Sequence, residues 1–133
     1  MTTIKSYTDL SQSKKLAEIL PIESADMYWK NGVSDKYIQC FTPFVIDEDR
    51  TNVDFDYDIP CWSLTALRNL LPPAIKPNKD SYLFLFESHN TFDNSWVYRY
   101  YDEDDTSYLY CKNISEIDAC YEMIIKLKEN KLI

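Results

Sequence analysis

The sequence predicts an α+β fold, in which an antiparallel sheet of three to five strands is packed by two to three helices. Two patterns favour this class: a segment near the C-terminus repeats apolar residues at helical spacing, and three short aromatic runs in series alternate like strands. The chain has 133 residues, of which 45% are hydrophobic and 27% are charged. This composition is typical of a soluble globular protein, and the length predicts a single domain over 1–133.

Three segments are predicted to be helices, because apolar side chains recur in each at the spacing of one helix face: 12–20, 62–71 and 115–130. Pro21 ends the first helix and the proline pair 72–73 ends the second, since proline cannot continue a helix. Polar residues at 11–13 offer an N-cap for the first helix. Ser63 and Ser115 are the predicted caps of the other two.

The rest of the first half is predicted to begin with a hairpin, in which 26–30 pairs with 36–41. A long acidic loop over 43–60 follows, with an edge strand at 44–46 within it. The hairpin prediction depends on the dipeptide Asn31-Gly32, which is a strong turn signal. Residues 72–80 contain several prolines and are predicted to be a connector.

Three strands follow, joined by short polar connections that favour an antiparallel meander: 81–87, 95–101 and 107–111. Alternation along each strand predicts one face made of aromatic rings: Tyr82, Phe84, Phe86, Trp96, Tyr98, Tyr100, Tyr108 and Tyr110. The opposite face is predicted to be largely aliphatic: Leu83, Leu85, Val97, Arg99, Tyr101, Leu109 and Cys111. We expect the aliphatic face to receive the C-terminal helix.

The predicted aromatic face needs a cover of its own, for which the N-terminal half, a second copy or a ligand are the candidates. Flat rings give a large contact area at low entropic cost, so an interaction surface is one interpretation. The alternative is ordinary packing, because tyrosine and phenylalanine favour strands. Arg99 is the only base in these three predicted strands, and single-strand nucleic-acid binders need basic side chains beside their rings. We therefore expect no direct nucleic-acid binding.

The formal net charge of −8 is concentrated in two segments, residues 47–58 with six acids and residues 102–105 with four. Such a chain repels phosphate backbones and anionic membranes. The alternating carboxylates that start at Asp54 do not fit a calcium loop, because Ile59 and Thr65 stand where that loop needs glycine and glutamate. We expect solvated acids and no metal, while an acidic mimic that blocks a nucleic-acid-binding protein remains an alternative.

Several kinds of chemistry are excluded by composition. The chain has one glycine, Gly32, so it has no glycine-rich phosphate loop, and one histidine, His89, so it has no two-histidine metal site. Cys61 precedes a predicted helix, whose N-terminus would lower a thiol pKa. We expect no catalytic residue and no cofactor. A small-ligand binder or enzyme that uses His89, Cys61 or the acidic loops stays open as an alternative.

A cytoplasmic location is predicted from the cysteines and from the N-terminus. The four cysteines form no CxxC pair: Cys40, Cys61, Cys111 and Cys120. The first ten residues lack the apolar core of a signal peptide, and the longest apolar run, 82–86, is far too short to span a membrane. We therefore expect four free and mostly buried thiols in a reducing compartment.

Three segments of the chain are distinctive together, and they begin with Gln12-Ser13-Lys14-Lys15-Leu16, Pro60-Cys61-Trp62-Ser63-Leu64 and Asp118-Ala119-Cys120-Tyr121-Glu122. In this order they resemble a group of small uncharacterised proteins that gut Bacteroidales, their prophages and other mobile elements encode. The resemblance implies a bacterial or phage context, and it carries no established activity and no catalytic residues. With the composition, it leads us to expect a non-enzymatic accessory or interaction module that binds a protein partner or itself.

Overall fold

The computed structural model describes all residues except 1–4, 34–38 and 105, and confirms the α+β class. Its strands form two antiparallel sheets, one of three strands and one of four, each with helices of its own unit beside it. The chain divides into two compact units, residues 7–66 and residues 1–6 with 67–133, so the boundary falls inside one helix. A single domain over 1–133 stays a prediction.

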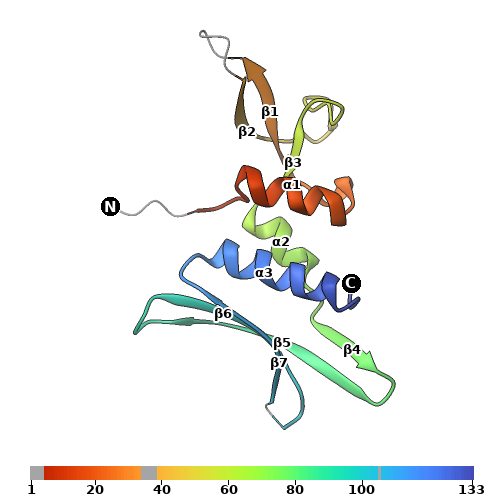
Figure 1. The fold of residues 1–133 in the computed structure, drawn as a ribbon, viewed down its shortest axis with the longest axis vertical. Coiled ribbons are helices and arrows are strands. Elements are labelled where there is room, and N and C mark those ends of the chain that lie inside the picture. The colour runs from red at the N-terminus through yellow and green to blue at the C-terminus, as the bar shows by residue number, and fades with distance from the viewer. Residues whose placement is uncertain (1–4, 34–38, 105) are drawn as a thin grey trace. The chain divides into compact units, whose positions relative to one another are not determined.

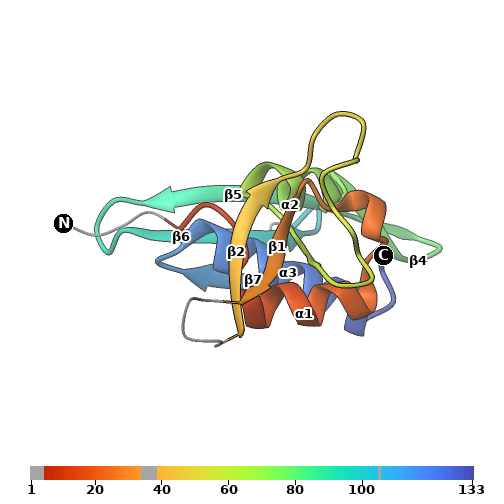
Figure 2. The same ribbon diagram turned by 90° about the horizontal axis from the view of Figure 1, so that it is seen from above.

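The unit of residues 7–66 contains one helix, one short 3₁₀ turn and three strands: α1 (Leu10–Ile19), η1 (Ile22–Ser24), β1 (Met27–Val33), β2 (Gln39–Val45) and β3 (Ile59–Cys61). The strands lie in the order β2-β1-β3, and Figure 2 shows β1 and β2 as neighbouring strands. Two antiparallel strands do pair in this region, but the predicted register and turn were wrong, because residues 27–30 lie opposite 42–45 and not opposite 36–41. Asn31 and Gly32 lie inside β1, opposite Phe41 and Cys40. The connection at 34–38 lies outside the described residues.

The predicted edge strand at 44–46 is the end of β2, whereas β3 was missed within the predicted loop. Helix α1 begins two residues before its predicted start, because Asp9 is the N-cap. The Asp9 side chain accepts from the Gln12 backbone N–H, and the Gln12 side chain accepts from the Asp9 backbone N–H. This reciprocal pair satisfies two backbone donors that the first turn leaves without partners.

The second unit contains four strands and the C-terminal helix: β4 (Ala74–Asn78), β5 (Ser81–Asn90), β6 (Ser95–Tyr101), β7 (Ser107–Asn113) and α3 (Glu116–Glu129). The boundary between the units falls within α2 (Leu64–Leu70), so each unit contains part of this helix. The strands form an antiparallel meander in the order β4-β5-β6-β7. The connector predicted at 72–80 was wrong, because most of it is β4. Pro77 makes that segment look unlike a strand, yet proline is tolerated on a sheet edge.

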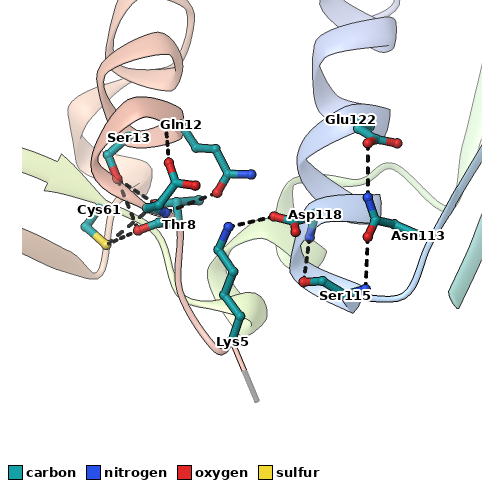
Figure 3. A network of polar contacts seen from close by, with 10 residues as sticks. Lys5, Thr8, Gln12, Ser13, Cys61, Asn113, Ser115, Asp118 and Glu122 are labelled. Atoms are coloured by element: carbon teal, nitrogen blue, oxygen red, sulfur yellow. Dashed lines mark hydrogen bonds and ion pairs between the residues drawn. The ribbon is translucent and has the colours of Figure 1, made fainter. Parts of the chain in front are cut away.

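Helix α3 lies along one face of this sheet and contacts β6 and β7 (Figure 1). Ser115 caps it as predicted, since its hydroxyl accepts from the Asp118 backbone N–H. The helix buries one apolar stripe: Ile117, Ala119, Cys120, Met123, Ile124 and Leu127. Lys5, near the N-terminus of the chain, forms an ion pair with Asp118 of this helix, and its Nζ lies 2.7 Å from Asp118 Oδ1 (Figure 3). Among the described residues, each helix is too short or too polar to cross a membrane.

Candidate functional site

The pairing of β5 with β6 decides which aromatic rings share a face of the four-stranded sheet. Phe86 lies opposite Arg99, and Glu87 lies opposite Tyr98. Since directly opposite residues share a face, Tyr98 and Phe86 are on different faces. The prediction of one continuous aromatic face was therefore wrong for β6, whose register is offset by one residue from the assumed one.

We call the face turned away from α3 the outer face. Its charged and aromatic side chains come from all four strands: Lys76, Tyr82, Phe84, Phe86, Arg99, Tyr101, Tyr108, Tyr110 and Lys112. Five of the predicted interaction rings are on it, each between 42% and 62% exposed: Tyr82, Phe84, Phe86, Tyr108 and Tyr110. In Figure 1, the described residues of this unit place no segment across that face.

Tyr98 and Tyr100 lie on the inner face, beneath α3, and are fully buried. The Tyr98 hydroxyl donates to the Glu116 carboxylate, and the Tyr100 hydroxyl donates to the Pro72 carbonyl at 2.7 Å. Burial raises the pKa of both hydroxyls, so they stay protonated donors. These two rings, predicted as part of an interaction surface, are core residues with satisfied polar ends.

Trp96, the third ring that the prediction misplaced, also lies on the inner face and is half-buried. It pairs with His89 across the strands, and their ring centroids are 4.5 Å apart. His89 Nε2 lies 2.8 Å from Asn94 Oδ1 at the end of the β5–β6 hairpin. The single histidine of the sequence therefore has an aromatic neighbour, at a tilted angle to its ring, and a hydrogen-bond partner.

Cations lie on the rings of the outer face. The Arg99 guanidinium is 4.9 Å from the Phe86 ring centroid and 5.0 Å from that of Tyr101, and it donates to Ser107 Oγ at 3.0 Å. Lys76 Nζ is 5.1 Å from the Tyr82 ring centroid. Such cation–π contacts hold a flexible basic side chain above a ring.

One end of the outer face carries an ion pair and a shallow hollow. Lys112 Nζ and Asp93 Oδ2 are 2.7 Å apart. The hydrogen bond from Lys112, with a second from Ser95, lowers the pKa of Asp93 to about 2. Lys112, Asp93 and Ser95 line a hollow of about 340 Å³ together with Asn113 and Ile114. Each polar side chain that lines the hollow already has a partner within the chain: Lys112 and Ser95 bind Asp93, and Asn113 donates to Glu122.

The acidic loops hold their carboxylates by local hydrogen bonds. Asp47 accepts from the Thr51 hydroxyl and the Thr51 backbone N–H, which lowers the Asp47 pKa. Asp58 accepts from the backbone N–H groups of Asp54 and Asn31. Among the described residues, no three metal-binding side chains gather into a cluster that would hold an ion. These carboxylates stabilise turns, which is a structural role.

Cys61 and its neighbours form a buried polar cluster in the first unit (Figure 3). Thr8 Oγ1 and Ser13 Oγ are 2.7 Å apart, and the Cys61 thiol donates to the Thr8 carbonyl at 3.4 Å. Burial raises the pKa of Cys61, the opposite of the helix-terminus effect expected from the sequence. A thiol held protonated and fully buried is a poor nucleophile.

Two of the other thiols, Cys111 and Cys120, follow the same rule. All four cysteines are free, three of them buried and Cys40 exposed. Burial raises the pKa of Cys111 to about 11 and that of Cys120 to about 12. None of the three buried thiols is suited to nucleophilic chemistry at neutral pH.

Three outer-face residues were not predicted from the sequence: Lys76, Tyr101 and Lys112. Lys76 was missed with β4, and Lys112 because β7 extends two residues beyond its predicted end. Tyr101 was assigned to the wrong face by the assumed register of β6. A signal was present in the alternation of Ala74-Ile75-Lys76, but the prolines that surround it hid it. No family model matches the chain, and no curated protein and no solved structure matches it either.

Proposed function

We propose that this chain is a non-enzymatic interaction module that uses the outer face of its four-stranded sheet to bind a protein partner or a second copy. The observation that carries the proposal is the group of exposed rings on that face. Contiguous exposed apolar surface is unusual on soluble monomers and often marks an interaction site. Aromatic residues and arginine, which this face combines, are also the residue types most enriched at binding hot spots.

The two edge strands of the sheet favour a partner that docks on the outer face over a partner that adds a strand at an edge. β4 is short, contains Pro77 and has a register shift relative to β5. At the other edge, Lys126 Nζ from α3 donates to the Tyr110 carbonyl of β7 at 2.6 Å. A proline and an edge carbonyl already bonded to a lysine are both devices that discourage strand pairing.

The cellular setting is part of the same proposal. Four cysteines without a disulfide suit a reducing cytoplasm. The resemblance to small Bacteroidales proteins favours an accessory role in a mobile element or phage. The environments of Cys61 and His89 give no support to the enzyme alternative, because both side chains are occupied structurally. The acidic carboxylates likewise serve their own turns, which gives the mimic alternative no support.

The experiment that tests the proposal is site-specific photo-crosslinking in cells of the native host. A photoreactive phenylalanine analogue replaces Phe86 on the outer face. Phe92, in the β5–β6 turn, and Tyr57, in the acidic loop, are matched controls, because both are more exposed than Phe86. We expect a discrete adduct from position 86 and none from the controls. An adduct of twice the 15.8 kDa chain mass identifies a second copy, and any other mass identifies a foreign protein.

Equal crosslinking from all three positions would contradict the proposal, because exposure alone would then explain the adducts. No adduct at position 86 would contradict it as well. A variant with Phe84→Ser beside the crosslinker tests the face further, and we expect it to abolish the adduct while the urea midpoint of the chain changes little.

A further inference from the structure

The exposed rings of the outer face come from two strands. β5 supplies Tyr82, Phe84 and Phe86, and β7 supplies Tyr108 and Tyr110. Each ring is between 42% and 62% exposed, so the five together present about 500 Å² of accessible surface, at about 200 Å² for a whole aromatic residue. Two such faces in contact would bury about 1,000 Å², the size of the smallest specific protein interfaces. The face is therefore large enough for a weak dimer and too small for a permanent one.

Opposite charges lie on the two sides of this face, at the same end of the strands. Lys76 is on the edge strand β4, and its Nζ is 5.1 Å from the Tyr82 ring centroid. The pairing of β5 with β6 ends at Phe84 and Tyr101, so Tyr82 lies beyond it, at the level of the turn that follows β6. Residues 102–104 of that turn are all acidic, and the turn leads into the other edge strand, β7.

The charged side chains at this end are open to a partner. Lys76, Glu103 and Asp104 are exposed, and none of the three forms an ion pair with another described residue. Asp102 differs from them, because its carboxylate accepts from the backbone N–H groups of Asp104 and Thr106 and so shapes the turn. The ring contact of Lys76 leaves its charge in place, so its ammonium still attracts a carboxylate.

A two-fold axis parallel to the strands, between β5 and β6, brings these unlike charges together. Because the strand order is β4-β5-β6-β7, this axis places β4 of one copy over β7 of the other and β5 over β6. It also keeps equivalent strand ends together, so Lys76 of each copy meets residues 102–104 of the other. Two-fold contacts are the commonest in homo-oligomers, and each contact in them occurs twice. Sheets that pack face to face also prefer nearly aligned strands.

We propose that the outer face binds a second copy of this chain in a two-fold dimer, in which the rings of the two sheets pack together and Lys76 of each copy pairs with Glu103 or Asp104 of the other. This inference rests on the proposed function and selects between the two kinds of partner that it allows. Arg99 keeps the contacts that it already makes within the chain.

The dimer is weak. Repulsion between two chains of net charge −8 opposes association, and the rings alone bury only a small interface. We expect a dissociation constant of about 10 µM or weaker. A dilute solution therefore contains the monomer, with its outer rings exposed.

The test is sedimentation velocity of the purified full chain over concentrations that span the expected dissociation constant. Lys76→Glu and Glu103→Lys each replace the proposed ion pairs with like charges. Lys30→Glu and Glu48→Lys are the matched controls, because they make the same changes at exposed positions of the other unit. We expect a reversible dimer that each key variant weakens at least about tenfold, since the contact occurs twice, and that the controls leave nearly unchanged.

A mixture of the two key variants tests the two-fold arrangement itself. In the mixed dimer, the new glutamate of one chain meets the new lysine of the other, while the unchanged Lys76 and Glu103 also meet. We therefore expect the mixture to associate about as strongly as the unmodified chain, although each variant alone does not. A variant that failed to fold would not recover in this way, so the mixture separates a lost contact from a lost fold.

A chain that stays monomeric at every concentration would overturn the inference. So would equal losses in the key variants and the controls, or a mixture that does not recover. These results leave the adduct from position 86 in cells unaffected, and an adduct with a mass other than twice that of the chain would then preserve the proposed function with a foreign partner. Absence of any adduct would instead end both proposals.

Discussion

Both faces of the β4–β7 sheet carry tyrosines, but the environments of these tyrosines differ. Tyr98 on the inner face is fully buried, with its hydroxyl bonded to Glu116. Tyr110 on the outer face is about half exposed, although it lies only one strand away. The difference teaches that tyrosine in a strand says little about its role until the register is known, because a slip of one residue exchanges core and surface.

The largest expected difference between the faces is in thiol reactivity. Cys111 is turned inward on β7, and burial raises its pKa to about 11. A Tyr110→Cys change puts a thiol on the next residue, turned outward, and is best made with Cys40→Ser to remove the exposed thiol. We expect the new thiol to react with a maleimide at least about a hundredfold faster than Cys111 at neutral pH. Mass spectrometry of labelled peptides measures both rates. Comparable rates would contradict the claim that position 111 is buried while position 110 is exposed.

The next largest difference should be in how much a tyrosine of each face contributes to the free energy of unfolding. Tyr98→Ala removes a buried ring and its hydrogen bond, so we expect the free energy of unfolding to fall by about 3–5 kcal/mol. Tyr110→Ala on the outer face should cost about 1 kcal/mol or less. Urea denaturation followed by tryptophan fluorescence measures both. Similar losses in the two variants would mean that the rings do not divide between core and surface.

The inner face also depends on the helix that covers it. Ser115→Ala removes the N-cap of α3 and should lower the free energy of unfolding by about 1 kcal/mol. Ser115→Asp, which keeps a capping oxygen, should recover most of that loss. If Ser115→Ala has no effect on the urea midpoint, α3 is not held by this cap.

The smallest expected effect lies at the margin of the outer face. The pKa of Asp93 is about 2 in the folded chain, below the value of about 3.9 for a free aspartate. A depressed pKa means that the Asp93 contribution to stability is present above pH of about 4 and is lost as the pH falls through about 2. Carbon NMR of the Asp93 carboxyl should give that midpoint. Lys112→Ala should raise it, and an unchanged midpoint would show that Lys112 does not hold this carboxylate.

Much of the fold follows from local patterns. The caps Ser63 and Ser115 and the proline stops define helices close to those observed, because capping and backbone sterics act over a few residues. The hairpin of β1 with β2 was also predicted, although Asn31-Gly32 extends the strand and does not turn it. There the pairing with β2 outweighs the turn preference of the dipeptide.

The candidate site was predictable only in part, because it depends on packing across strands. The alternation of residues between the two faces of β5 and of β7 correctly predicted that five rings share one face. The pairing of Phe86 with Arg99 has no local signature in the sequence, so the face of β6 was assigned wrongly. β4 was missed because edge strands tolerate proline, and with it Lys76, which lies over the Tyr82 ring.

The most direct test of the central claim is hydroxyl-radical footprinting of the tyrosines, in the purified chain and in the adduct crosslinked from position 86. In the chain alone, we expect oxidation of Tyr82, Tyr108 and Tyr110 and protection of the buried inner-face rings. In the adduct, the three outer rings should lose reactivity while Tyr57 keeps its own. Oxidation of the inner-face rings in the folded chain, or outer rings that stay reactive in the adduct, would contradict the account.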